Sequence, residues 1–454
     1  MIKKIYTIMF VNIHSHRYKI LALIILLTPT LAISQVWKLK QCLDTAMINN
    51  KNLQMSKNWI IIGDQKHKEA IANLIPKLNV TADYRYNIEL PYQLMPAAVF
   101  GGPAGTFKEA QFGVPHNVNA SLQLMAPLYN PQIYGAIETT RIAYEITELQ
   151  YQKTEEQVYF DVCNLYYNAQ ILNYQLRFID SNLINSNKLL KNIELLKENL
   201  LARNTDVNKV RLQVELLNTQ KEVILNKYHQ VVNALKFSIG IPFDYNIQID
   251  DNITLPNGND YISFTTIDIR IAETQKKLVS SELNTLQSSR LPTLSLYATY
   301  GQNGYGYDKK PNDFLKFYPI SFAGIQLSFP LFSGTVIRRK INQKKVELQN
   351  SNLQLSLISE QNRMLTENST SQKNVAYKTI ITTHNQISLA QEVYEQTLLQ
   401  QSEGVASLTD VILADNSLRE AQQSYLSSII EYLKADLELK KLTGNISFNN
   451  QKNK

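Results

Sequence analysis

Four short stretches of the chain alternate apolar and polar residues with a period of two. Two lie at about 77–88 and 117–128, and two more at about 293–303 and 320–331. Such alternation predicts β-strands with one apolar and one polar face. In the first strand the polar positions are Asn79, Thr81, Asp83 and Arg85. A Gly-rich loop separates the two strands of each pair, and we expect the longer first loop to carry its extra residues at its tip.

Elsewhere the apolar spacing is helical. The stretches 131–202 and 334–404 contain almost no Gly or Pro, and at about 1.5 Å per residue each predicts a helix of roughly 105 Å. Return helices are predicted over 206–239 and 410–443. Both carry an apolar seam spaced by three and four residues, as in a coiled coil. The seams are Val207, Val210, Val214 and Leu217, and Val411, Ala414, Leu418 and Ala421.

Two further helices are predicted over 37–75 and 265–290. Each return helix is about half as long as the outgoing one. A shorter helix stacked end to end on it would line the rest, with irregular chain filling the shortfall in the second half.

The chain contains two copies of the same order of elements. Thr205-Asp206-Val207 recurs as Thr409-Asp410-Val411 at an offset of 204, and Gly240 recurs as Gly444 at the same offset. Internal repetition of this kind is the signature of a duplicated supersecondary unit. We therefore predict a first repeat at 35–240, an irregular connector at 241–264, a second repeat at 265–444 and a tail at 445–454.

Residues 1–34 have the features of a signal peptide. Four Lys or Arg residues precede an apolar run at 20–27, and Ala32-Ile33-Ser34 offers a cleavage site of small residues. The run is shorter than the roughly 20 residues that a membrane span needs. We expect export, a mature chain that starts at Gln35, and the loss of four of the positive charges behind the net charge of +7.

Composition argues against several function classes. A hydrophobic share of 44% with 19% charged residues is typical of a folded chain. Without a long Lys/Arg run, the mild basicity gives no reason to expect nucleic acid. Cys42 and Cys163 are too few for a disulfide scaffold or a structural metal site, and we expect two buried thiols, with a disulfide between them left open. The histidines lack metal-ligand spacing and the Gly clusters lack the context of a phosphate loop, so we expect no cofactor and no enzyme.

The predicted strands match the length of a membrane crossing, about 9–11 residues. The alternation alone fits a soluble, half-buried sheet equally well. The export signal and the fully polar second face favour a membrane. Four strands cannot close a barrel, and open edges in lipid would leave backbone groups without partners. Several protomers must then contribute strands to one barrel. Two protomers would give eight strands and a lumen filled by side chains, whereas three would give twelve strands and leave a passage.

The order of these elements, stated twice, resembles the TolC-like outer-membrane efflux family over nearly the whole mature chain. The most specific local match is Gly404–Leu418, which reads GVASLTDVILADNSL. The resemblance implies an α+β membrane protein: a homotrimer with a twelve-stranded transmembrane β-barrel, four strands from each protomer, continued by an α-helical coiled-coil barrel. It also implies an outer-membrane location with a long periplasmic portion, no catalytic centre, and passive exit for substrates delivered by an inner-membrane transporter and a periplasmic adaptor.

The resemblance also points to site residues at the tip of the helices. Asp410 matches a position whose acidic side chains ring the narrowest part of the channel, although Asp410 could instead only cap its helix. The second acidic ring would fall on Leu413, so Asp415 is a further candidate whose facing is open. We expect Asp206 to cap or hydrogen-bond at the first turn, Thr205 to lie beside it at the tip of the channel, and Gly404 to act as a tip hinge. The first copy has Leu200 where the family usually has Gly.

The sequence leaves other questions open. A trimeric coiled-coil adhesin or structural rod of the cell surface is the alternative to a channel, but no passenger region remains once strands and helices are assigned. Positions where the family often latches its closed state hold Gln401 and Ala406, so the latch is undefined. The cargo, the cognate pump and the adaptor cannot be identified from these residues.

Overall fold

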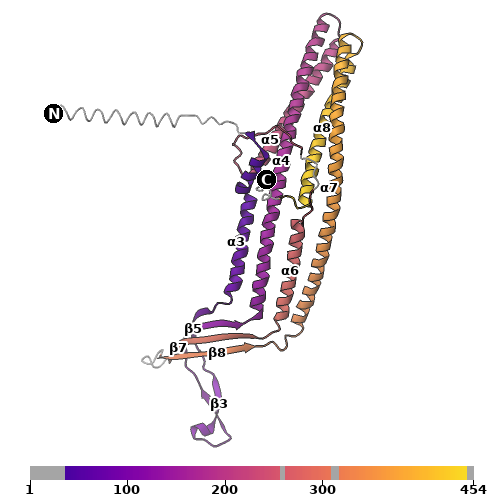
Figure 1. The fold of residues 1–454 in the computed structure, drawn as a ribbon. Coiled ribbons are helices and arrows are strands. Elements are labelled where there is room, and N and C mark those ends of the chain that lie inside the picture. The colour runs from indigo at the N-terminus through magenta and orange to yellow at the C-terminus, as the bar shows by residue number, and fades with distance from the viewer. Residues whose placement is uncertain (1–35, 256–260, 308–315, 447–454) are drawn as a thin grey trace, which may run out of the picture. The chain divides into compact units, whose positions relative to one another are not determined.

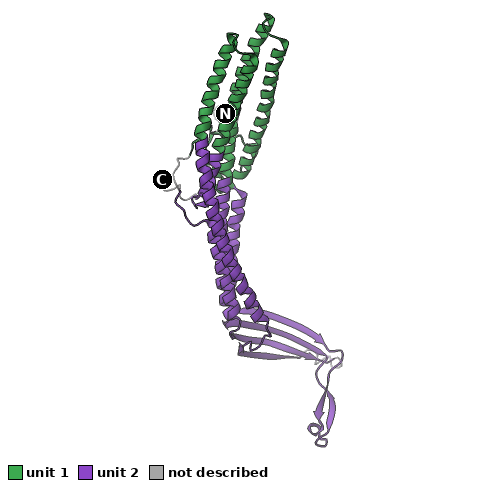
Figure 2. Cartoon of the chain, turned by 90° about the vertical axis from the view of Figure 1, so that its right-hand side faces the viewer, with its two compact units in different colours: residues 1–49, 161–255, 380–430 green, residues 50–160, 256–379, 431–454 purple. Residues whose placement is uncertain are grey.

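A computed structural model describes residues 36–255, 261–307 and 316–446, divided between two compact units. Unit 1 holds 1–49, 161–255 and 380–430, and unit 2 holds 50–160, 256–379 and 431–454 (Figure 2). The predicted signal peptide at 1–34, and the tail from 447 onward, lie outside the described residues.

The helices are long and few (Figure 1). The outgoing helices are α4 (Pro131–Glu198) and α7 (Val336–Ser402), and the return helices are α5 (Asn204–Ile239) and α8 (Leu408–Leu442). The shorter α6 runs from Ile267 to Ser288. Among the described residues, none of the helices combines the length and apolar content of a membrane span.

The single helix predicted over 37–75 is wrong, because two helices occupy this stretch. They are α2 (Leu39–Asn49) and α3 (Lys51–Ala72). Asn50 leaves the helical conformation between them, and its Oδ1 accepts hydrogen bonds from the backbone N–H groups of Asn52 (2.9 Å) and Leu53 (3.1 Å). Asn is among the residues preferred at this capping position, so its side chain starts a new helix.

Four antiparallel strands form one sheet in unit 2. They are β2 (Lys77–Tyr86), β5 (His116–Tyr129), β7 (Thr293–Gly306) and β8 (Lys316–Ser328), in the order β2-β5-β7-β8. The register keeps like faces together: Val80 pairs with Leu122, which pairs in turn with Tyr300. β2 and β8 are the two edges, and each has one side of its backbone unpaired within the sheet.

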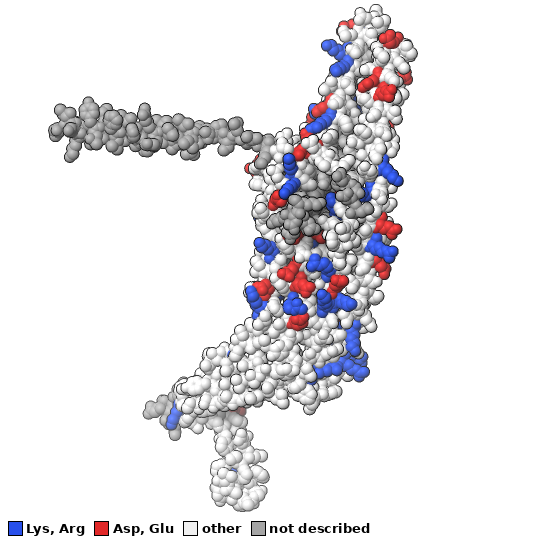
Figure 3. Space-filling model, viewed as in Figure 1, with Lys and Arg blue, Asp and Glu red and all other residues white. Residues whose placement is uncertain are grey.

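The sheet is a single exposed layer. All ten residues of β2 are exposed, and none of the thirteen in β8 is buried. On the apolar face Leu78, Val80 and Ile325 are 61%, 77% and 65% exposed. A soluble sheet would bury this face against a core, so the half-buried sheet that the alternation allowed does not hold for the protomer. Figure 3 shows on the viewed face that charged side chains lie mostly over the helices and few over the strands.

The first strand-to-strand loop, predicted only as a Gly-rich loop, contains a second small sheet. β3 (Tyr92–Pro96) pairs antiparallel with β4 (Phe107–Gln111), with Tyr92 opposite Gln111. A short 3₁₀ turn at Ala97–Phe100 follows β3. The extra residues of this loop therefore form a β-hairpin (Figure 1).

The connector between the two halves is anchored by polar contacts. In unit 1, β6 (Gln248–Ile249) pairs in parallel with β1 (Val36–Trp37). In unit 2, the Tyr261 hydroxyl donates to Oδ1 of Asp436 (2.6 Å), and Asp436 is only 2% exposed. Burial raises the pKa of Asp436, but Lys373 (2.8 Å) and Lys440 (2.9 Å) outweigh it and the net pKa is lowered.

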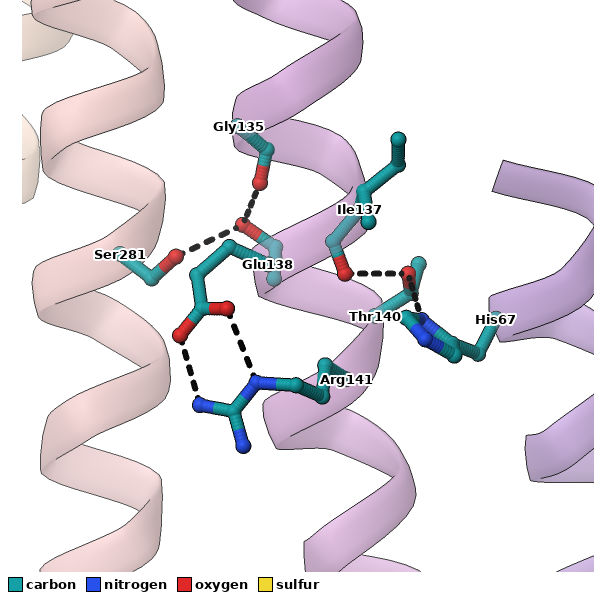
Figure 4. Close-up of polar contacts among 8 residues, drawn as sticks. His67, Gly135, Ile137, Glu138, Thr140, Arg141 and Ser281 are labelled. Atoms are coloured by element: carbon teal, nitrogen blue, oxygen red, sulfur yellow. Dashed lines mark hydrogen bonds and ion pairs between the residues drawn. The ribbon is translucent and has the colours of Figure 1, made fainter. Parts of the chain in front are cut away.

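In unit 2, α4 is joined by hydroxyl groups to the helix on either side of it (Figure 4). Thr139 lies within hydrogen-bond distance of Ser281 on α6 (3.1 Å), and Thr140 of His67 Nδ1 on α3 (3.2 Å). Gly135 is required by close packing here, because a Cβ would lie 2.3 Å from Oγ1 of Thr285. Small and hydroxyl side chains thus let α4 approach both neighbours.

The two cysteines lie in unit 1. Cys42 and Cys163 are both buried thiols, and no disulfide joins these two described residues. Burial raises the pKa of the Cys42 thiol to about 12. At neutral pH such a thiol is protonated and behaves as a small apolar side chain.

Candidate channel constriction at the helical turns

The predicted site residues lie in unit 1, at the turn between α4 and α5 and the turn between α7 and α8, except Asp415, which lies within α8. The seams of the two return helices pack beneath these turns. Val207, Val210, Val411 and Leu418 are at most 2% exposed and belong to one apolar cluster with Tyr394 of α7. The seam prediction is confirmed for these positions, while Ala421 is only half-buried.

Both outgoing helices end in the same backbone motif. At the first turn the N–H groups of Leu200 and Leu201 donate to the carbonyls of Lys197 (2.9 Å) and Leu196 (2.8 Å). At the second, Gly404 and Val405 donate to Gln401 (3.1 Å) and Gln400 (2.8 Å). This is the Schellman arrangement, which needs a left-handed residue after the helix.

Leu200 and Gly404 supply that left-handed residue, with φ of 65° and 72°. Glycine adopts it without steric cost, whereas a leucine carries a backbone strain of roughly 1–2 kcal/mol. The Leu200 side chain is 93% exposed, so packing does not offset that strain. The two turns therefore share the same backbone conformation, but only the first carries backbone strain from its left-handed residue.

Asp410 caps α8 through a reciprocal pair of bonds with Ser407. Oδ2 of Asp410 accepts from the backbone N–H of Ser407 (2.9 Å), and the N–H of Asp410 donates to the Ser407 hydroxyl (3.2 Å). The Ser407 hydroxyl also donates to Oδ2 (2.7 Å), and this bond together with the one from the Ser407 backbone N–H holds the pKa of Asp410 below its usual value. The carboxylate is exposed, so capping leaves it open to the surroundings.

Asp206 holds the equivalent position in the first turn with weaker contacts. Its Oδ2 accepts from the backbone N–H of Arg203 (3.3 Å), and its Oδ1 lies 3.9 Å from Nζ of Lys209. A guanidinium has no acceptor, so Arg203 cannot return the bond as Ser407 does. Thr205 is exposed at the start of α5.

Asp415 lies inside the packed helices. It is 6% exposed, and its carboxylate is paired with the guanidinium of Arg419 one turn later. Nη2 of Arg419 also lies 3.3 Å from the Ser186 hydroxyl on α4. The Gln213 amide of α5 lies between the two charges: one orientation puts Nε2 3.3 Å from Asp415, and the other puts its oxygen 2.9 Å from Arg419. In the protomer this carboxylate therefore lies among the packed helices of unit 1.

Burial acts on both members of this ion pair. It raises the pKa of Asp415, a rise that Arg419 limits, and it lowers the pKa of Arg419. Nε of Arg419 is buried without a hydrogen-bond partner among the described residues. The pair is therefore held in a site with little water, where losing one charge would be costly.

The two turns differ sharply in charge. Residues 380–418 contain five Asp or Glu and no Lys or Arg, whereas the equivalent 176–214 contain four Asp or Glu and seven Lys or Arg. The acidic group includes Glu403, which is exposed beside Gly404. Glu403 was not among the predicted site residues, although comparing charges between the two copies would have found it. No group of three or more metal-ligating side chains occurs in the part of the chain that the structure describes.

Comparisons with known proteins agree on the fold. No model of a known protein family matches the chain. Outer membrane protein TolC of Salmonella enteritidis is 19% identical over 433 residues, which cover 91% of this chain and 83% of TolC.

Two solved structures of outer-membrane proteins also match the chain. The outer membrane protein VceC of Vibrio cholerae matches with a TM-score of 0.73 and 15% identity, covering 89% of this chain and 96% of VceC. The CmeC outer membrane channel of Campylobacter jejuni matches with a TM-score of 0.72 and 13% identity, covering 89% of this chain and 85% of CmeC.

Proposed function

We propose that this chain, a TolC-like outer-membrane protein, is the channel-tunnel of a tripartite efflux or type I secretion system. It gives passive exit to substrates that an inner-membrane pump and a periplasmic adaptor deliver. The observation that carries the proposal is the bare four-stranded sheet, whose apolar face is exposed and whose edges, β2 and β8, are open. Such a sheet is stable only where lipid covers the face and other strands cover the edges.

We propose that three copies close the barrel, with β8 of each pairing with β2 of the next. Twelve strands leave a passage, whereas the eight strands of a dimer would fill with side chains. The detergent-extracted protein should have the mass of a trimer and form conducting pores in planar lipid bilayers. A monomeric mass, or a trimer that never conducts, would overturn the proposal.

We propose that Asp410 forms an acidic ring at the constriction, with Gly404 as the hinge of its turn. Its carboxylate is exposed, and the turn lies in the acidic copy of the repeat. Three carboxylates brought together in a pore favour cations and raise one another's pKa, against the lowering by Ser407. Asp415 serves instead to hold the helices, and Asp206 and Thr205 shape the first turn.

The ring can be tested by single-channel recording. Asp410→Ala should weaken block by multivalent cations, because three negative charges leave the constriction. Asp206→Ala removes the equivalent carboxylate of the first copy and is the matched control, expected to leave block nearly unchanged. If multivalent cations block wild type and Asp410→Ala equally, the assignment of Asp410 to an acidic ring is wrong.

The remaining parts of the proposal follow from the same architecture. The two repeats at 35–240 and 265–444 each supply one sixth of the ring, joined by the connector at 241–264. The protein has no catalytic centre, and energy comes from the pump. An adhesin or structural rod has less support, since it gives no reason for a bare sheet with open edges.

A further inference from the structure

The segment that joins β8 to α7 exposes large apolar side chains. Phe329, Leu331, Phe332 and Val336 are 54%, 85%, 87% and 57% exposed. They directly follow β8, on whose apolar face Ile325 and Leu327 are also exposed. Exposed apolar side chains gathered in one segment indicate an interaction surface.

Three cations follow at once. Arg338, Arg339 and Lys340 are all exposed in the first turns of α7, and none forms an ion pair with another described residue. Positive charge is unfavourable at the N-terminal end of a helix, where the backbone dipole is itself positive. Neither the helix nor an acidic neighbour therefore accounts for these three side chains.

Two stretches of sequence beside these cations add no negative charge. Residues 316–346 contain no Asp or Glu, and the adjacent stretch 283–307 contains none either. There Arg290 and the 46% exposed Leu291 repeat the combination of cation and apolar side chain just before β7, the strand that pairs with β8. Figure 3 shows a group of Lys and Arg side chains at the strand-side end of the helices.

We propose that Arg338, Arg339 and Lys340 bind the phosphates of anionic phospholipids in the leaflet nearest the helices, with Leu331 and Phe332 inserted among the acyl chains. The inference rests on the proposed barrel, since it needs the end of β8 to mark the membrane surface. Apolar anchors beside cations are the pattern of a membrane interface. Charge complementarity selects anionic over zwitterionic headgroups.

The test compares lipid selectivity of the reconstituted full-length protein. Wild type goes into vesicles of phosphatidylcholine with a minority of phosphatidylglycerol, and spin-labelled lipids of each kind report the fraction immobilised by the protein. Each Lys or Arg near an anionic surface contributes about fivefold. Wild type should retain phosphatidylglycerol over phosphatidylcholine at least fivefold, with a smaller preference at high salt.

The variant Arg338→Gln/Arg339→Gln/Lys340→Gln should lose most of this preference and still insert and conduct. Arg338→Lys/Arg339→Lys should keep it. The control Lys188→Gln/Lys191→Gln/Lys197→Gln removes the same charge from the part of α4 that belongs to unit 1, and should also keep it.

The outcomes separate the two proposals. If wild type inserts and conducts but shows no preference for phosphatidylglycerol, or if the control variant loses the preference as fully as the test variant, the lipid site is overturned and the channel stands. The lipid site is overturned in the same way if a second copy covers the segment, because the triple variant would then change trimer stability and not lipid retention. Failure of wild type to insert at all overturns the channel proposal and this inference together.

Discussion

Replacing Asp415 by Asn should destabilise the helical part of the protein strongly. The side chains of Asp415 and Arg419 are 9% and 18% exposed, so the substitution leaves a guanidinium in a nearly dry site without its counter-charge. Removing one member of a buried pair costs about 3–5 kcal/mol. Ser186 and Gln213 remain beside Arg419, so we expect the low end, about 3 kcal/mol per protomer.

A double-mutant cycle tests whether this cost comes from the pair. In Asp415→Leu/Arg419→Met neither charge remains, and apolar replacements of buried pairs are often neutral or stabilising. The double variant should therefore be more stable than Asp415→Leu alone and than Arg419→Met alone, and these four proteins give a coupling free energy of about 2 kcal/mol or more.

Urea unfolding in detergent, followed by far-UV circular dichroism, measures the difference, and half-lives at one fixed temperature replace it if unfolding is irreversible. Asp410→Asn, which changes an exposed carboxylate on the same helix, is the control and should change stability much less. A loss below about 1 kcal/mol for Asp415→Asn, or single-variant losses that simply add in the double variant, would refute the account of a coupled buried pair.

Three further outcomes are expected. Leu200→Gly should stabilise the first turn by about 0.5–1 kcal/mol, because the left-handed strain that it relieves exceeds the chain entropy that it adds to the unfolded state. Gly404→Ala should destabilise the second turn by a similar amount, and hydrogen exchange at the two turns measures both effects. Burial and Asp268 raise the pKa of Glu156 to about 7. Between about pH 4.5 and 7 the folded state therefore binds a proton that the unfolded state has lost, so the free energy of unfolding should fall as the pH rises through this range. Glu156→Gln should make the free energy of unfolding depend less on pH, as unfolding measured at several pH values would show. Tyr261→Phe removes a hydrogen bond to the buried Asp436 carboxylate and should cost about 1.5–3 kcal/mol, seen as faster proteolysis at the connector; equal rates would refute it.

The strands and long helices could be predicted from the sequence because each depends on local periodicity. A period of two over 77–86 is enough to predict β2, and the spacing of Val207, Val210 and Val214 is enough to predict which face of α5 is buried. The duplication further predicted that Val411 and Leu418 would be buried in the same way, as they are.

The misses have physical causes of another kind. The hairpin β3–β4 depends on pairing between Tyr92–Pro96 and Phe107–Gln111, which no local pattern enforces. The break at Asn50 depends on one side chain taking two backbone N–H groups, a choice that competes with continuing the helix. Leu200 is left-handed because the turn must close, against the preference of the residue itself.

The sequence by itself determined the four strands and the apolar seams, because the side chains of neighbouring residues are enough to encode a period. Only the tertiary structure decided that Asp415 faces Arg419, Ser186 and Gln213 while Asp410 stays exposed. Both are acidic residues on α8, and what separates them is which other helices pack against each side. Such packing brings together residues that lie far apart in the chain, so a local sequence pattern could not predict which of the two carboxylates is buried.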